Sequence, residues 1–125
     1  MIYNKEEYKI KFYADSKTKK SDIFKYLKNL NIKERTKVAK YINYLKLNKG
    51  YLDEPYSKHI TGKIRELRVD FSHNRHRIFY FTFVEKNIIL LHAFLKKTPK
   101  TPRKEIDRAI NNYKDFIANK NTYEC

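Results

Sequence analysis

Residues 63–104 decide the fold, and their sequence is KIRELRVDFSHNRHRIFYFTFVEKNIILLHAFLKKTPKTPRK. Within this stretch His76–Val84 is rich in β-branched and aromatic residues and apolar on both faces, which is typical of a central strand. Glu85–Asn87 is predicted to turn the chain, and Ile88–Leu95, too short for a lone core helix, is then the partner strand of a hairpin. Ile60–Val69 alternates less regularly but is also predicted as a strand, ahead of a break at Asp70–Asn74.

The sequence before this stretch predicts one more strand and two helices. Tyr8–Tyr13 alternates between apolar residues and lysines, as a half-buried strand does. Apolar residues at helical spacing predict helices over residues 21–30 and 31–47, and Asn31-Ile32-Lys33-Glu34 resembles a capping box at the start of the second. The two helices should form a hairpin, since almost no loop separates them.

A third helix is predicted at the C-terminal end. Thr101 and Pro102 mark its start, because proline is pre-organised for the first helical position. Its apolar stripe consists of Ile106, Ala109, Ile110, Tyr113 and Ile117. Residues 119–125 should fray. The predicted order strand-helix-helix-strand-strand-strand-helix is an α+β fold, with helices packed on an antiparallel sheet.

Composition points to a basic protein of one domain. A length of 125 residues favours a single domain over 1–125. The net charge of +15 predicts attraction to polyanions, nucleic acid first and an acidic protein second, although a Lys-rich surface can also be merely solvating. Cys125 is the only cysteine and suggests nothing catalytic. No stretch approaches the length of a membrane span, so we expect a cytoplasmic protein.

Basic residues gather at the strand ends. If the strands pair as predicted, five cations surround one surface of the sheet, and we interpret that surface as a phosphate-binding site. These are Arg68, Arg75, Arg77, Lys96 and Lys97. The alternative is that they pair structurally with Asp70, Glu66 or Glu85.

Metal-free RNA cleavage would need a group to deprotonate a 2′-hydroxyl, cations for the pentavalent phosphate and an acid for the leaving 5′-oxygen. Candidates for the proton transfers are His73, His76, His92, Glu66 and lysines whose pKa is lowered by cationic neighbours. We expect no metal or cofactor, because no ligand set and no glycine loop that could cradle a phosphate is present.

Four motifs occur in order: Glu66-Leu67-Arg68, Arg77-Ile78-Phe79-Tyr80, residues 90–98 (LLHAFLKKT) and residues 100–106 (KTPRKEI). With the N-terminal Ile10-Lys11-Phe12-Tyr13 strand, they resemble the HigB-type, phage-derived branch of the RelE/ParE toxin superfamily over about residues 8–118. The resemblance implies a compact sheet with the two N-terminal helices on one side. It also implies a type II toxin–antitoxin toxin, a ribosome-dependent mRNA endonuclease neutralised by a helix-turn-helix, HigA-like antitoxin.

The resemblance also implies site residues. Arg77 matches the arginine that RelE-like toxins place against the scissile phosphate, Lys97 the basic residue just past the following strand, and Glu66 and Arg68 the branch's own motif. RelE's lysine pair would fall on Ile64 and Glu66, so its lysine-based proton abstraction does not transfer. The predicted catalytic residues are Arg77, Lys97, Arg68, Lys96, Glu66 and His92. The predicted RNA-binding residues are Lys63, Arg65, Arg75, Lys100, Arg103 and Lys104.

Two alternatives remain open from the sequence. One is a ParE-like inhibitor of DNA gyrase on the same fold, which would bind a protein and need no phosphate-centred site. The other is a non-catalytic nucleic-acid-binding regulatory module, because the same fold can carry different functions. In the favoured interpretation the partners are the antitoxin, the ribosome and mRNA, with DNA contacted only through the antitoxin complex.

Overall fold

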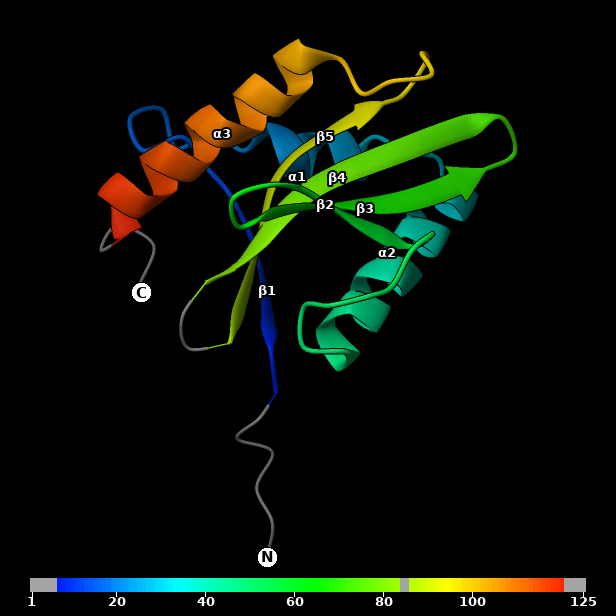
Figure 1. The fold of residues 1–125 in the computed structure, drawn as a ribbon, viewed down its shortest axis with the longest axis horizontal. Helices are drawn as coiled ribbons and strands as arrows, with labels where there is room; N and C mark the ends of the chain where they lie inside the picture. Colours follow the sequence, from blue (N-terminus) through cyan, green and yellow to red (C-terminus); the bar gives the residue numbers. More distant parts are fainter. Residues whose placement is uncertain (1–6, 84–85, 121–125) are drawn as a thin grey trace, which may run out of the picture.

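A computed structural model describes residues 7–83 and 86–120 of the protein. Within them the chain forms a five-stranded sheet of order β1-β5-β4-β3-β2 and three helices (Figure 1). The elements are β1 (Lys9–Phe12), α1 (Asp22–Lys28), α2 (Ile32–Leu47), β2 (Ser57–Thr61), β3 (Ile64–Phe71), β4 (Asn74–Phe83), β5 (Asn87–Leu95) and α3 (Arg103–Ala118). The predicted α+β class is confirmed, and β4 is the central strand as predicted.

Three details of the predicted sheet were wrong. The segment predicted as one strand, Ile60–Val69, contains a turn, because Gly62 takes a φ of +54° and divides it into the end of β2 and most of β3. The sheet is also not wholly antiparallel, since β1 pairs with β5 in parallel. The break expected at Asp70–Asn74 is only a tight turn, with β3 reaching Phe71. The predicted turn at 85–87 and tail at 119–125 lie partly outside the described residues.

Each face of the sheet carries its own core. On one face the helical hairpin of α1 and α2 packs against the sheet, as expected, with Leu45 of α2 and Tyr80 of β4 fully buried there. On the other face lies α3 (Figure 1), and its buried residues pack against Phe79 and Phe81 of β4. The central strand is apolar on both faces because both faces are covered.

A bulge in β5 sets which side chains reach the α3 face. Phe79 is opposite His92 and Tyr80 is opposite Leu90, so Leu91 is an extra residue in β5. As a result Leu91 and His92 both lie on the α3 side, since Leu91 joins the α3 core and His92 stacks on Phe79.

Local chemistry fixes the helix ends near their predicted positions. The side chains of Ser21 and Asn31 cap α1 and α2 by accepting hydrogen bonds from backbone N–H groups. After α2, Gly50 takes a φ of +84° and lies against Thr82 of β4.

The third helix begins at Arg103, next to the predicted Pro102, but the predicted apolar stripe needs one correction. Phe116 is buried and Ile117 is 37% exposed, because Phe116 continues the packed face from Ala109. The Asp115 carboxylate ties α3 to the start of the chain by accepting hydrogen bonds from the Tyr13 hydroxyl (2.6 Å) and from the N–H and hydroxyl of Ser16. None of the helices in the described residues is long and apolar enough to cross a membrane.

Candidate active site

A buried carboxylate and an arginine form the first half of the candidate site. Glu66 and Arg68 alternate along β3 and face the α3 side, as their cross-strand partners Phe79 and Arg77 show. Glu66 is 1% exposed, and one of its oxygens lies 3.1 Å from Nε of Arg68, whose side chain is 25% exposed. The other oxygen accepts a hydrogen bond from the Thr101 hydroxyl at 3.3 Å. The buried carboxylate therefore holds the guanidinium of Arg68 at the surface.

The second half is the adjacent pair of Arg77 and Asp70. Arg77 is 6% exposed, and its Nη1 donates to the Asp70 carboxylate at 2.8 Å and to the carbonyl of His76 at 3.0 Å. Its Nε is buried and finds no hydrogen-bond partner among residues 7–83 and 86–120. The alternative considered from the sequence, in which these arginines pair with Glu66 and Asp70, thus occurs, and the buried Nε of Arg77 keeps no partner within the described residues.

Lys96 adds a third cation just after β5. Its backbone N–H donates to the carbonyl of Arg75, which places it beside β4. Burial of the ammonium group, and then the positive charge of Arg77, lower the pKa of Lys96, with Arg68 and Arg75 acting in the same direction. The side chain can therefore give up its proton more readily than an ordinary lysine, which suits proton transfer.

The sheet thus brings Glu66, Arg68, Arg77 and Lys96 together, with Arg75 beside them. Lys97 is exposed on the following loop. Lys63, Lys100, Arg103 and Lys104 are also exposed, and Arg103 forms an ion pair with Asp107 at 2.9 Å.

Arg65 lies away from the cluster. It is paired with Tyr80, so it faces the α1–α2 side of the sheet. Its Nε donates to the Ser57 hydroxyl at 3.1 Å, and its guanidinium lies 4.8 Å from the ring of Tyr51. These contacts hold the 51–57 segment against β3.

His92 is on the same face as the cluster, but its side chain contacts α3. Its Nε2 lies 2.6 Å from the Glu105 carboxylate, and its ring packs beside those of Phe79 and Phe94, with ring centres 6.3 Å and 6.0 Å away. Burial lowers the pKa of His92, while Glu105 acts in the opposite direction. The histidine therefore positions the N-terminal turn of α3, and with it Thr101, behind the cluster.

His76 belongs to a buried network on the opposite face. Its Nδ1 lies 2.7 Å from the Tyr26 hydroxyl and its Nε2 2.7 Å from Glu34, which also accepts hydrogen bonds from the side chains of Asn31 and Asn74. The hydrogen bond from His76 lowers the pKa of Glu34, and burial raises the pKa of Tyr26 to about 12. This network ties both helices of the hairpin to β4. His73, the third candidate, is exposed in the β3–β4 turn.

Sequence reasoning missed the contribution of Thr101, which it treated only as a helix start. The hydrogen bond to Glu66 spans 35 positions, and no local pattern signals such a contact. Within residues 7–83 and 86–120, no three metal-ligating side chains come together.

Comparison with known protein families identifies the family of this chain. The family model described as "Phage derived protein Gp49-like (DUF891)" matches residues 25–114, which include α2, every strand except β1 and most of α3. No curated protein matches the sequence. The chain therefore belongs to the phage-derived Gp49-like family, a RelE/ParE-like family of toxins in toxin–antitoxin systems, and membership implies an antitoxin partner.

Proposed function

We propose that this protein is a HigB-type toxin of a type II toxin–antitoxin system, and that it acts as a metal-independent endoribonuclease on mRNA bound to the ribosome. The observation that carries the proposal is the cluster of Glu66, Arg68, Arg77 and Lys96 on one face of the sheet. A gyrase inhibitor would need no such concentration of cations around a buried carboxylate.

The cluster suggests a division of labour. The 2′-hydroxyl of the RNA would give its proton to a water molecule as its oxygen attacks the neighbouring phosphorus. The bond to the 5′-oxygen would break at the same time, which leaves a 2′,3′-cyclic phosphate and a 5′-hydroxyl. Arg68 and Arg77 would neutralise the charge that builds on the phosphate oxygens. Lys96 would give its proton to the leaving 5′-oxygen, and its lowered pKa favours that transfer. Glu66 would orient Arg68.

Exposed cations around the cluster would hold the RNA backbone. Lys97, Arg75, Lys100 and Lys104 surround the loop that connects β5 to α3, while Lys63 lies in the turn between β2 and β3. Together with the net charge of +15, they support docking on ribosomal RNA with a strong dependence on salt. The proposed neutralising partner is a HigA-like helix-turn-helix antitoxin, and the proposed compartment is the cytoplasm.

Primer extension on cellular mRNA tests the activity. After induction of this chain alone, we expect cuts within codons that disappear when translation is blocked. Growth arrest with intact transcripts would instead support a gyrase inhibitor. Absence of arrest would support a non-catalytic binding module.

The site is tested best at Arg68, because Arg77 is buried and its removal risks the fold. We expect Arg68→Ala to lower cleavage about 100-fold or more, the usual effect of losing one charge-stabilising donor. Lys97→Ala should weaken the activity less, since Lys97 is exposed on the loop. Lys114→Ala removes an exposed cation of α3 and should cut like the wild type. Equal cleavage by Arg68→Ala and Lys114→Ala would contradict the proposed site.

A further inference from the structure

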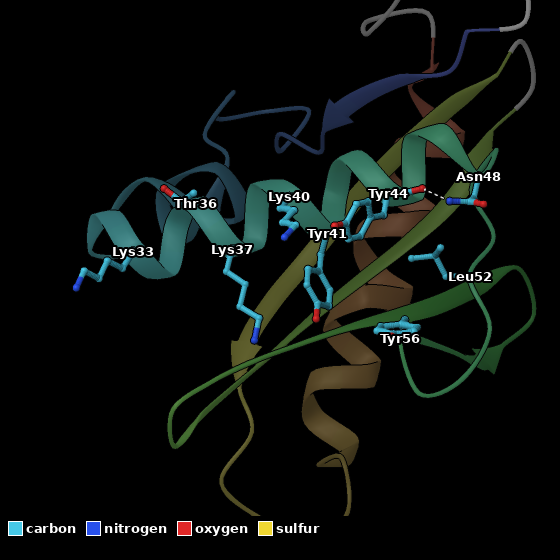
Figure 2. Close-up of a pocket in the computed structure, with 9 residues that line it drawn as sticks. All are labelled: Lys33, Thr36, Lys37, Lys40, Tyr41, Tyr44, Asn48, Leu52 and Tyr56. Carbon is cyan, nitrogen blue, oxygen red and sulfur yellow. Dashed lines mark hydrogen bonds between the residues drawn. The ribbon is translucent and has the colours of Figure 1, made fainter.

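A second feature of the molecule, a groove of about 700 Å³, lies between α2 and the segment that leads into β2 (Figure 2). It is distinct from the candidate active site, because α2 packs on the opposite face of the sheet. The residues that line it are Lys33, Thr36, Lys37, Lys40, Tyr41, Tyr44, Asn48, Leu52 and Tyr56. Three are lysines, three are tyrosines and none is acidic.

The tyrosines present ring surface to solvent. Tyr44 is 38% exposed and Tyr56 is 49% exposed. Tyr41 lies between them, with its ring centre 5.8 Å from that of Tyr44 and 6.0 Å from that of Tyr56, and the rings are inclined to one another. Figure 2 shows Tyr41 and Tyr44 projecting from α2 on the side where Tyr56 lies. Exposed aromatic faces of this kind are what unstacked nucleic-acid bases bind.

The lysines follow the same side of α2. Lys33, Lys37 and Lys40 are four and three residues apart, so they form a row about 10 Å long on one face of the helix. The ammonium groups of Lys37 and Lys40 lie 5.6 Å and 5.9 Å from the rings of Tyr41 and Tyr44. Charge for a polyanionic backbone thus lies directly beside the surfaces that could stack bases.

One contact links this groove to the candidate active site. The ammonium of Lys37 donates a hydrogen bond to the backbone carbonyl of Asp70, whose carboxylate holds Arg77 on the other face. The groove therefore reaches the β3–β4 hairpin from one side, while the cluster occupies the other side of the same hairpin.

We infer that this groove binds single-stranded RNA, with bases stacked on Tyr44 and Tyr56 and phosphates paired with the lysine row. The inference rests on the proposed function, in that the RNA would be a strand of the same ribosome–mRNA complex. An acidic protein segment fits less well, because lysine is depleted in the cores of protein interfaces, whereas partly exposed tyrosine rings beside lysines suit the bases and phosphates of a single strand.

The test measures binding of the full-length protein to a fluorescent eight-nucleotide oligouridine by anisotropy, without ribosomes. We expect Tyr44→Ala/Tyr56→Ala to weaken binding at least tenfold, equivalent to about 1.4 kcal/mol. Lys33→Ala/Lys40→Ala should lower the slope of log K against log salt by about 1.4, or about 0.7 for each phosphate contact in a single strand. The control Lys25→Ala/Lys114→Ala removes two exposed cations outside the groove and should leave the slope unchanged.

Several results would overturn the inference. One is failure of the wild type to bind oligouridine, and another is binding of oligouridine by the tyrosine variant as tightly as by the wild type. A third such result is displacement of the RNA by a poly-glutamate peptide as efficiently as by unlabelled oligouridine, because that would indicate a site for an acidic protein. Thermal unfolding of each variant separates lost binding from lost folding. A wild type that binds through the groove but cuts no mRNA would refute the proposed function and leave the groove in place.

Discussion

Replacing Glu34 by alanine should destabilise the protein by about 3 kcal/mol. Glu34 is 6% exposed and accepts hydrogen bonds from His76 (2.7 Å), Asn31 (2.8 Å) and Asn74 (2.8 Å). His76 is 2% exposed, so without Glu34 its ring nitrogen loses a partner where water is scarce, at a cost of about 2 kcal/mol. The two asparagines lie nearer the surface and should add about 0.5 kcal/mol each.

That loss is a large part of the free energy of unfolding of a domain, which is usually about 5–15 kcal/mol, so urea unfolding can measure it. Glu34→Gln keeps the shape and one acceptor oxygen and should cost less than half as much. Arg35→Ala is a matched control, because this exposed neighbour on α2 makes only a 3.2 Å bond to the carbonyl of Lys28. A cost below about 1 kcal/mol for Glu34→Ala, or equal costs for the two Glu34 variants, would refute the reasoning.

The same carboxylate predicts how stability depends on pH. Its pKa is lowered in the folded protein, chiefly by the hydrogen bond from His76, so the stabilisation is fully present above the unfolded value of about 4.3. It is lost as pH falls through the lower, folded pKa. Wild-type stability should therefore drop below pH 4 more steeply than that of Glu34→Gln.

Two further predictions concern the fold. In urea unfolding, Gly50→Ala should cost about 1–3 kcal/mol more than Gly62→Ala. Both glycines have positive φ, so the backbone strain is similar, but an added Cβ at Gly50 would lie 2.3 Å from Thr82 Oγ1, whereas at Gly62 it would meet open space. Asp115→Asn should cost about 1–2 kcal/mol at pH 7. Burial raises the pKa of Asp115, but the hydrogen bonds from Tyr13 and Ser16 together outweigh it and lower the pKa, so the cost should shrink as pH falls through this lowered pKa. A cost that does not vary with pH would contradict this.

The elements that could be predicted from the sequence are those with a local signal. The strand from His76 carries apolar residues for two cores, and Ser21 and Asn31 indicate the starts of the two helices that they cap. β2 has no such signal, because its Ser57-Lys58-His59 sequence is polar, and the hydroxyl of the buried Ser57 bonds with Tyr80 and Arg65, which lie 23 and 8 residues away. The direction of β1 is likewise invisible in its own residues, since alternation looks the same in parallel and antiparallel strands.

The candidate site shows the same limit. Alternation along β3 and β4 places Glu66, Arg68 and Arg77 on one face, and that much can be predicted from a period of two. The same rule assigns Arg65 to the opposite face, but Arg65 was predicted to bind RNA because of its charge alone. Whether a histidine serves the site or the core depends on a distant partner, as His76 shows by its bond to Glu34.

The bulge in β5 makes that strand sensitive to its length in an unusual way. Deleting Leu91 would restore regular alternation, and the residue that now supports α3, His92, would remain on its present face beside Phe79. Deleting any residue of the strand other than Leu91 or its neighbour His92 would instead move every later side chain to the opposite face of the sheet. The extra residue thus marks the position where this strand can be shortened without exchanging the contents of the two cores, and length variants among relatives should fall there.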